Sequence, residues 1–550
     1  MSERPCSESS MWSRILRSLS PARWTGGGLF VILVWILLYL PRIFVLGFYG
    51  DDWFCFVDAS QGTMPFSPAR FLNFVGFFTS YAPRPVLGLI AFLFSSIFGT
   101  SAWGFQLGAA VLVLAAALSL RRWLSLLLAD VQESRSFCAD GATIFWLAMP
   151  WMLGVTAWPV LSQTLVAQIF FTEACRILLT RKVATISSRV LFAVLLVASG
   201  LTYEAFYFQI FIILGFYAIS FKSRFRWRYQ LLPAFGLACS AQLIVILVNR
   251  YSARVNPAFS KHWNAEWFRT AESSLLGLPR ILKPTIAESF PFVCAACVVL
   301  TAACTALLAV GMRRESSRPL ALRIVGIFLL GVGATCVSAV TFALAGYSFQ
   351  SDGVSSRTLF SASWGFTIVY FGLISCFAIK ATMVSKMMVS KWCLALSGAA
   401  VVVGMGYAQR YRVDEWAHAW HEQQKILAHV PASQIKELPR NSAVFFVGPG
   451  YYRGVPIFGA VHDITSAVFS LPPLAGARRP HNWRTPIYPA TELYAWKWNG
   501  ENITISQPGS WSFTYATPTK HLYVWKYPEE RLEEVSAGFV WPPPDRTSTP

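Results

Sequence analysis

Two adjacent carboxylates, Asp51 and Asp52, stand in the stretch FYGDDWFCFVDAS, directly after the first long apolar run of the chain. Between Glu8 and Asp130 the only other acidic residue is Asp58. Aromatic residues flank the pair on both sides, so we do not expect it to lie in a freely solvated loop. A carboxylate at a membrane edge is costly unless it is used, and paired carboxylates can act as a general base or bind a cation.

Three further charged residues could take part in the same chemistry. Arg84 in YAPRP and Arg357 in SSRTLF each lie at the expected start of an apolar span. Arginine grips phosphate oxygens bidentately, although an ordinary interfacial arginine that reaches for headgroups is the alternative for both. Glu204 in GLTYEAF is the only acid between residues 190 and 221, and it either binds a polar ligand or makes a structural hydrogen bond between helices.

Other polar residues favour structural roles. Glu173 has Arg176 three residues further on, which is the spacing of a local helix pair. His418 and His421 share a helix face without acidic or cysteine partners, so we assign no metal site there. The cysteines fall mostly inside apolar runs, where a thiol behaves as a small hydrophobic side chain, and none belongs to a CxxC pair with metal-ligand flanks.

The composition is that of a polytopic membrane protein. The chain has 550 residues, of which 55% are hydrophobic and only 13% charged, and its mean hydropathy is +0.48. Length and hydropathy together indicate a helical bundle of about 11 to 13 spans of roughly 20 residues each. The net charge of +19 resides almost entirely before residue 409 and fits loops between spans, so we predict no nucleic-acid partner.

The apolar segments that predict the spans begin after a basic N-terminal stretch. They lie at 27–47, 84–98, 103–119, 141–158, 160–179, 189–201, 204–221, 229–249, 291–311, 323–344, 358–379 and 392–408. Breaks are expected at Pro150, Pro159 and Gly200. Basic clusters at 181–182, 222–228 and 313–318 should be cytoplasmic, which leaves the residues after 409 on the far side together with Asp51.

These patterns divide the chain into regions. We predict a cytoplasmic segment over 1–26, a transmembrane domain over 27–408 and an extracytoplasmic domain over 409–540, followed by a disordered tail over 541–550. The first extracytoplasmic loop, 48–83, contains an amphipathic juxtamembrane helix in PFSPARFLNFVGFFTSY. The C-terminal domain should be small and β-rich or α/β, because AVFFVG, NITIS and HLYVWKY have the composition of strands. Its many Trp and Tyr residues favour a core over a glycan-stacking face.

In layout the chain resembles the GT-C glycosyltransferases. These are integral membrane enzymes with one span, an extracytoplasmic loop that opens with an acidic pair, many further spans and a C-terminal soluble domain. The resemblance covers essentially the whole chain, and in residues it rests on GDDW, YAPRP, GLTYEAF and SSRTLF. It is strongest for the bacterial branch that uses polyprenyl-phosphate-linked sugars to modify lipopolysaccharide or other cell-envelope glycans. The doublet here is DD, whereas protein mannosyltransferases typically carry DE.

The resemblance implies a donor, an acceptor and a set of roles. Asp51 would be the general base, and Asp52 would either orient Asp51 or bind a divalent cation, a metal that this branch often dispenses with. Arg84 and Arg357 would bind the donor phosphate, and Glu204 would orient a sugar hydroxyl or pair with an arginine. The partners would be a polyprenyl-phosphate sugar, a glycan or lipid acceptor and membrane lipids. The active site would then face the outside of the plasma (inner) membrane.

Two other functions remain open from the residues alone. A flippase or transporter for a lipid-linked sugar would be expected to show repeated halves and charges at mid-membrane, and neither is visible in the sequence. A glycan polymerase or ligase would keep the far-side arginines but would not need the acidic doublet beside the first span. The clustering of the charged candidates near one face favours the glycosyltransferase.

Overall fold

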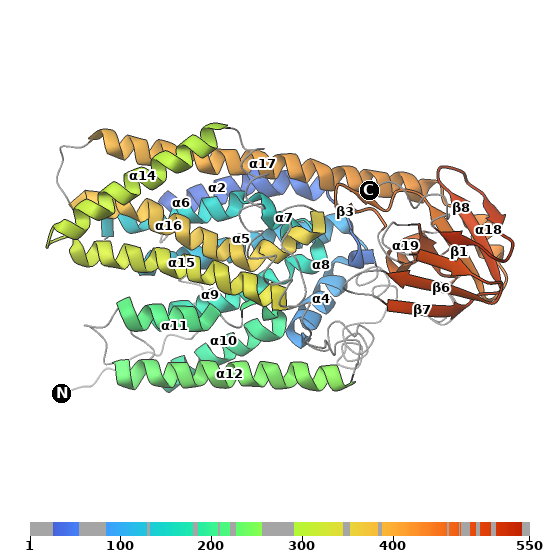
Figure 1. Cartoon of the computed structure of the whole chain (residues 1–550), viewed down its shortest axis with the longest axis horizontal. Coiled ribbons are helices and arrows are strands. Elements are labelled where there is room, and N and C mark those ends of the chain that lie inside the picture. Colours follow the sequence, from blue (N-terminus) through green and yellow to red (C-terminus); the bar gives the residue numbers. More distant parts are fainter. Residues whose placement is uncertain are drawn as a thin grey trace, which may run out of the picture.

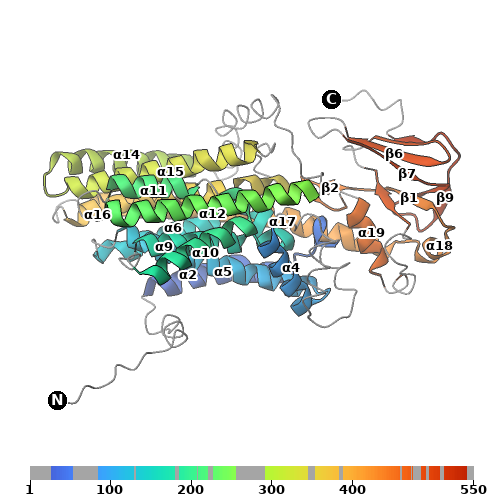
Figure 2. The ribbon, with the colours of Figure 1, turned by 90° about the horizontal axis from the view of Figure 1, so that it is seen from below.

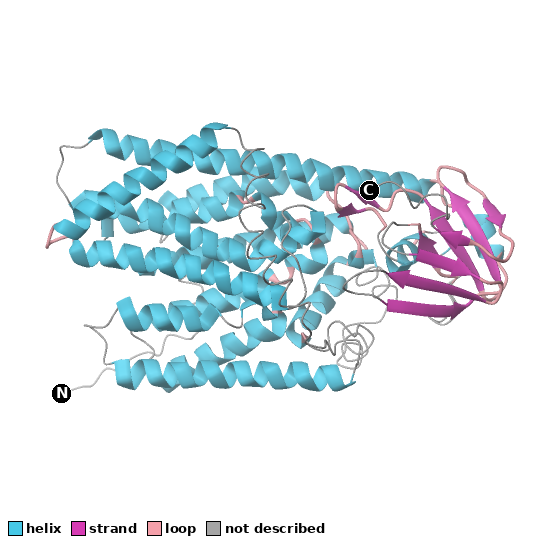
Figure 3. Ribbon diagram, viewed as in Figure 1, coloured by secondary structure: helices cyan, strands magenta, loops and turns pink. Residues whose placement is uncertain are grey.

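The protein is a helical bundle joined to a smaller, strand-containing domain, as seen in a computed structural model (Figures 1 and 3). The structure describes residues 26–53, 84–128, 132–179, 185–206, 209–220, 227–255, 291–344, 353–382, 388–458, 461–471, 474, 485–490, 495–507 and 513–541. The juxtamembrane helix expected within residues 65–81, the loop over 256–290 and residues 542–550 of the C-terminal tail lie outside these residues.

Every predicted span corresponds to helical structure. The helices of the bundle are α2 (Gly26–Tyr39), α4 (Pro85–Phe98), α5 (Ala102–Leu127), α6 (Gln132–Ala148), α9 (Leu165–Leu179), α10 (Ile186–Thr202), α11 (Gln209–Ser220), α12 (Trp227–Val255), α14 (Pro291–Arg313), α15 (Arg318–Leu344), α16 (Phe360–Thr382) and α17 (Met388–Ala428). Short 3-10 turns connect them: η2 (Leu40–Phe44), η5 (Pro150–Met152), η7 (Glu204–Phe206) and η9 (Gly353–Leu359). The fold class predicted from the sequence is therefore confirmed.

Four helical stretches of the described chain are long and apolar enough to cross a membrane, and a bent pair makes a fifth. Shorter apolar helices account for other predicted spans, for example α4 and α10. Large apolar side chains on the outside of the bundle, such as Leu37, Val194 and Leu247, are about half exposed or more, as expected where a helix faces lipid. The chain is thus a multi-pass membrane protein, and the full number of its spans stays a prediction.

The break predicted at Pro150 is present and turns the chain sharply. Residues 136–148 and 150–156 together are apolar enough for one span but are bent by 60° where they meet. Proline lacks the backbone N–H and clashes with the preceding turn, which explains why α6 ends here. After the bend, two one-turn helices follow, α7 (Leu153–Thr156) and α8 (Pro159–Ser162), the second again opened by a proline. This broken segment lies at the end of the bundle nearer the strands (Figure 1).

Helix α17 joins the two parts of the molecule. It runs for 41 residues without a break, from the bundle into the C-terminal domain (Figures 1 and 2). The sequence predicts a span that ends at residue 408 and an amphipathic helix over 412–430 that leaves the membrane, whereas the structure has one continuous helix. Gln409, fully buried at the point where the two were expected to part, donates to the carbonyl oxygens of Leu147 and Met149 at 2.9 and 3.2 Å. Those bonds tie α17 to the end of α6.

The C-terminal domain contains two four-stranded sheets. Its elements are α18 (Ala432–Glu437), β1 (Ser442–Val447), β2 (Tyr451–Tyr452), β3 (Val455–Pro456), α19 (Val461–Phe469), β4 (Ile487–Pro489), β5 (Ala495–Trp498), β6 (Asn502–Gln507), β7 (Phe513–Pro518), β8 (His521–Lys526), β9 (Leu532–Glu534) and β10 (Val540–Trp541). One sheet has the order β4-β1-β8-β9, with β1 parallel to both neighbours, and the other is antiparallel in the order β10-β5-β6-β7. The strands expected in AVFFVG, NITIS and HLYVWKY are β1, β6 and β8.

Aromatic residues of this domain form its core. Trp496 and Trp525 are fully buried, and Tyr488 is almost so. The Phe445 ring packs edge-on against Trp496, and the Tyr488 ring lies 4.9 Å from the same indole, centroid to centroid. These contacts agree with the core interpretation, while Trp483, Tyr494 and Trp511 lie outside the described residues.

A basic turn lies at one end of the bundle. The tight turn between α14 and α15, which carries the basic run RRESSR, lies at the end of the bundle opposite the C-terminal domain (Figure 1). The positive-inside rule assigned that turn to the cytoplasm and the C-terminal domain to the far side. This turn and the C-terminal domain lie at opposite ends of the bundle, and the side of the membrane that each one faces stays a prediction.

Candidate active site

The acidic doublet forms a tight turn at the junction of the bundle and the C-terminal domain. Gly50 has φ +46°, a conformation that side chains with a Cβ rarely adopt, and it reverses the chain just before Asp51. The Asp52 and Trp53 amides donate back to the carbonyl oxygens of Tyr49 and Gly50, which closes the turn. The two carboxylates then point into different surroundings: Asp51 is exposed, whereas Asp52 is fully buried.

Asp52 joins the doublet to the broken segment after α6. Its two carboxylate oxygens accept backbone hydrogen bonds, one from the Tyr49 amide at 2.9 Å and one from the Val160 amide at 2.8 Å. Hydrogen bonds to an ionised acceptor are short and about twice as strong as neutral ones. Because Val160 lies in the first turn of α8, its amide has no partner within the helix, and the carboxylate supplies one. Asp52 therefore positions two chain segments.

A buried glutamine makes a second clamp between the same two segments. Gln106 of α5 donates through its side-chain amide to the carbonyl oxygens of Gly47 and Ala157, at 2.7 and 3.0 Å. Only 3% of this residue is exposed. Both bonds lie within a few residues of the Asp52 contacts, so the doublet and the segment at 157–160 are held together from two sides.

The turn is also fixed against α17. The Tyr49 hydroxyl donates to the Trp416 carbonyl oxygen at 2.8 Å, and the Trp53 indole N–H donates to Gln423 Oε1 at 3.1 Å. Burial is the main reason why the pKa of the Tyr49 phenol is raised above its ordinary value, so the phenol keeps the proton that it donates. Gly47 lies so close to Trp420 that a Cβ there would sit 2.0 Å from the indole ring. The doublet therefore sits on a rigid base.

Arg357 reaches the doublet through a tryptophan. Its guanidinium carbon lies 5.6 Å from the centre of the Trp158 ring, within the range of a cation–π interaction. The same ring lies against Gly50, where a Cβ would be 3.1 Å from its Cζ2 atom. Trp158 is 4% exposed and directly precedes Pro159 and Val160. The tryptophan thus contacts both the doublet's turn and Arg357.

A close approach between α7 and η9 fixes the backbone of Arg357. The Gly154 amide donates to the Ser356 hydroxyl oxygen at 2.9 Å. A Cβ on Gly154 would lie 2.5 Å from that oxygen and 2.6 Å from the Arg357 amide nitrogen, so only glycine fits. Helix η9 also contacts η5, so the turn that leads into α16 is packed on the broken segment. Its other neighbours are α15, α16 and β3.

Arg84 also contacts an aromatic ring. It precedes α4, and its guanidinium carbon lies 5.2 Å from the centre of the Tyr203 ring. Tyr203 is 7% exposed and packs near Phe342 and Phe360, with centroid distances of 6.3 and 6.5 Å. Phe360 lies three residues after Arg357 in the chain, so the ring that contacts Arg84 is a neighbour of the helix that Arg357 precedes.

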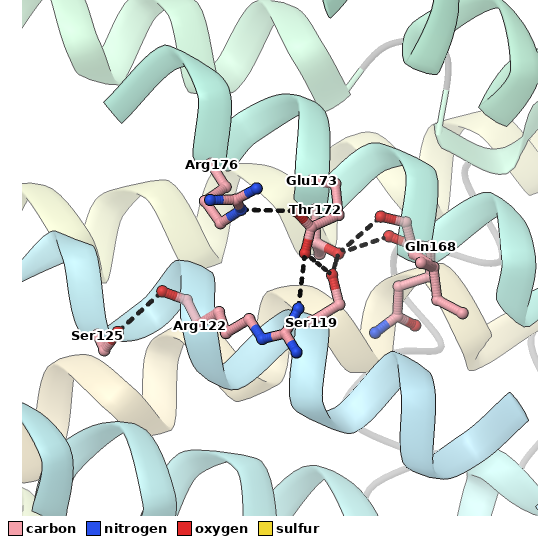
Figure 4. A network of polar contacts seen from close by, with 8 residues as sticks. Ser119, Arg122, Ser125, Gln168, Thr172, Glu173 and Arg176 are labelled. Atoms are coloured by element: carbon pink, nitrogen blue, oxygen red, sulfur yellow. Dashed lines mark hydrogen bonds and ion pairs between the residues drawn. The ribbon is translucent and has the colours of Figure 1, made fainter. Parts of the chain in front are cut away.

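The remaining candidates lie in two places. Glu204 opens η7, directly after Tyr203, so its backbone lies beside the residue that contacts Arg84; its side chain is outside the described part. Glu173 belongs to a different site. It accepts hydrogen bonds from Arg176 and from the Ser119 hydroxyl, with Arg122 at 3.9 Å, as Figure 4 shows. The predicted pair between Glu173 and Arg176 is confirmed.

A metal does not fit the doublet well. Both Asp52 oxygens accept backbone N–H groups inside a fully buried side chain, whereas Mg²⁺ requires several oxygen ligands and retains water. Across the described residues, no group of three or more His, Cys, Asp or Glu side chains could hold a metal ion. His418 packs against the Tyr452 ring instead, with the ring centroids 4.1 Å apart. We derive no step through a divalent cation.

Sequence reasoning missed the residues that connect the site. Trp158, Gly154 and Gln106 lie in apolar runs that read only as spans. A signal was present for the first of these, since two prolines within ten residues predict that the chain leaves its helical course near Pro150 and Pro159. A polar glutamine inside an apolar helix was a second signal, because such a side chain must find buried partners.

Comparison with known proteins adds a fold similarity. No model of a known protein family matches this chain, and no curated protein matches its sequence. Among solved structures, it is similar to the crystal structure of the Archaeoglobus fulgidus oligosaccharyltransferase in complex with Zn and sulfate, with a TM-score of 0.42 and 12% sequence identity. The similarity covers 82% of this chain and 61% of that one, so this chain spans about three-fifths of its length. At that level the similarity carries no weight for substrate or mechanism.

Proposed function

We propose that this chain is a membrane glycosyltransferase that moves a sugar from a polyprenyl-phosphate donor to an extracytoplasmic glycan or lipid acceptor. Asp51 acts as the general base. The single observation that best supports this is the contact set of the segment at 158–160: Val160 bonds Asp52, and Trp158 contacts both Gly50 and Arg357. An acidic turn and a phosphate-gripping arginine thus share one rigid support.

The two carboxylates have different roles in this mechanism. Each carboxylate oxygen of Asp52 accepts a backbone hydrogen bond, and the side chain thereby fixes the turn that presents Asp51. Asp51 is exposed, and in this proposal it accepts the proton from the acceptor hydroxyl. The acceptor oxygen then bonds to the anomeric carbon as the bond between that carbon and the phosphate oxygen breaks. The departing polyprenyl phosphate keeps the electron pair, so atoms and charge balance.

The arginines take the negative charge that develops on the leaving phosphate. Preorganised donors placed where charge develops lower the barrier more than flexible ones, because they need no reorganisation during the reaction. Arg357 and Arg84 are each held against a buried ring, Trp158 and Tyr203. Glu204, next to Tyr203 in the chain, is the candidate to orient a sugar hydroxyl. These roles follow the resemblance to the polyprenyl-phosphate branch of the GT-C enzymes.

The test is made in cells that lack the chain and carry a variant in its place. Mass analysis of surface glycans and of lipid-linked sugars should show loss of one sugar modification and accumulation of its donor without the chain. Asp51→Asn should reproduce that loss while the protein still reaches the membrane at the normal level. If the chain were a flippase, its loss would instead trap the donor on the cytoplasmic side. Labelling of the lipid-linked sugar in intact and in opened vesicles detects such trapping. Unaltered glycans with Asp51→Asn would refute the proposal.

A further inference from the structure

We infer that Trp158 is a positioning residue that sets where the Arg357 guanidinium stands relative to the Asp51–Asp52 turn. The inference rests on the proposed function and adds to it the residue through which the two halves of the site communicate. Trp158 lies between α7 and α8, directly before Pro159 and after the bend at Pro150, so its place in the chain does not by itself mark it as part of a site.

The Trp158 indole lies between the turn of the doublet and Arg357. One region of the ring contacts the backbone of Gly50, and the guanidinium of Arg357 lies over the ring at 5.6 Å from its centre. At Gly50 the positive φ brings the turn close to the indole without a side chain between them. A change in the position of this ring therefore moves the arginine relative to the doublet.

The partner of the Arg357 guanidinium in this contact is an aromatic ring. An aromatic face attracts a guanidinium through the quadrupole of the ring, but it does not neutralise the positive charge. A carboxylate partner would compete directly with a phosphate for the same N–H groups, which lie in the guanidinium plane. The contact with Trp158 therefore holds the Arg357 guanidinium near the ring without cancelling its positive charge.

The backbone on both sides of Trp158 is held in place. Trp158 cannot move freely, because the Ala157 carbonyl on one side bonds Gln106 and the Val160 amide on the other bonds Asp52. Its own indole N–H is buried and has no hydrogen-bond partner within the described part of the structure. Polar bonds of the indole therefore do not fix its position, which is set by packing in a buried apolar cluster and by the contacts with Gly50 and Arg357.

The experiment combines labelling with ligand binding on the purified full-length protein in detergent. Phenylglyoxal modifies accessible arginines, and mass spectrometry of the peptide that contains Arg357 gives its rate of modification. Trp158→Leu should change that rate at least threefold, and Trp158→Phe, which keeps an aromatic face, should restore it to within twofold. Trp151→Leu is the matched control, since Trp151 is a buried tryptophan of the same segment that packs on Phe366.

Ligand binding then relates this to the proposed function. Farnesyl phosphate, a short polyprenyl monophosphate, should stabilise the wild type against heat, and farnesol should not. Trp158→Leu should weaken the affinity for farnesyl phosphate about 3- to 10-fold, as expected for loss of one cation–π contact. In an Arg357→Ala background the same exchange should have no further effect, because Trp158 acts through the arginine.

The outcomes separate the two hypotheses. An unchanged rate of Arg357 modification in Trp158→Leu overturns the positioning role, whether or not the protein binds farnesyl phosphate. An equal change in Trp151→Leu also overturns it, since the effect would then be general loosening of the segment. If Arg357 labelling changes as expected but farnesyl phosphate does not bind, the positioning role stands and the proposed donor is wrong.

Discussion

Substitution of Asp52 should lower the stability of the fold strongly, whereas substitution of Asp51 should leave it nearly unchanged. Asp52→Ala removes both oxygens that accept the Tyr49 and Val160 amides, in a side chain with no exposure to solvent. Leaving a buried donor without its partner costs about 1 to 3 kcal/mol, and more where the lost partner was charged. Two such donors give an expected loss of about 3 to 6 kcal/mol, which is a large share of the stability of a typical domain.

Asp51→Asn should behave differently. The side chain is exposed, and substitutions of exposed side chains typically change stability by about 0.5 kcal/mol or less. The assay is thermal unfolding of both purified variants in the same detergent, followed by tryptophan fluorescence, with Asp52→Asn as an intermediate case that keeps one acceptor oxygen. Asp52→Ala should unfold several degrees below the wild type, and Asp51→Asn at the wild-type temperature.

Two results would refute this reasoning. If Asp52→Ala unfolds with the wild type, the carboxylate does not hold the segment at 157–160 to the turn, and the division of roles between the acids loses its basis. If Asp51→Asn is destabilised as strongly as Asp52→Ala, then Asp51 is also a structural residue. A loss of activity in Asp51→Asn could then no longer be attributed to chemistry.

Three further substitutions test the supports of the site. Gly154→Ala places a methyl group 2.6 Å from the Arg357 amide, so it should cost about 1 to 3 kcal/mol and weaken binding of farnesyl phosphate, measured by thermal shift; unchanged binding would mean that η9 is not fixed by α7. Gln106→Leu leaves two carbonyl oxygens without their donor and should lower the unfolding temperature, whereas a neutral effect would show that Asp52 holds the segments alone. Tyr203→Leu should alter phenylglyoxal modification of Arg84 while Tyr203→Phe should not, because the ring and not the hydroxyl contacts the guanidinium; equal effects of the two would contradict this.

Much of the fold could be predicted because membrane spans have a strong sequence signal. Long apolar runs have few alternatives to a helix in lipid, so α5, α14 and α15 follow directly from hydropathy. Short strands with β-branched and aromatic residues likewise predicted β1 and β8. The continuity of α17 could not be predicted, since its polar second half reads as a separate amphipathic helix. In the structure, the buried side-chain bonds of Gln409 to α6 and the burial of Trp416 against the Tyr49 ring hold this part of the helix in place.

The charged residues of the candidate site stand out in the sequence, whereas the residues that support them do not. Asp51, Asp52, Arg84 and Arg357 are conspicuous because charges are rare in this chain, and a rare charge at a membrane edge demands a reason. Burial separates the two acids, yet nothing in the letters DD says which of them faces solvent. That distinction depends on a contact with Val160, which lies 108 residues further along the chain. Long-range pairing of this kind is a property of the fold.

The central claim is that Asp51 takes the proton of the acceptor, and the most direct test is sugar transfer by the purified protein in vesicles. The vesicles carry a polyprenyl-phosphate sugar extracted from cells that accumulate it in the absence of the chain. Asp51→Asn should bind farnesyl phosphate with wild-type affinity and unfold at the wild-type temperature, yet transfer at least a hundredfold more slowly, the usual size of a general-base contribution. Transfer at the wild-type rate by a correctly folded Asp51→Asn protein would contradict the account.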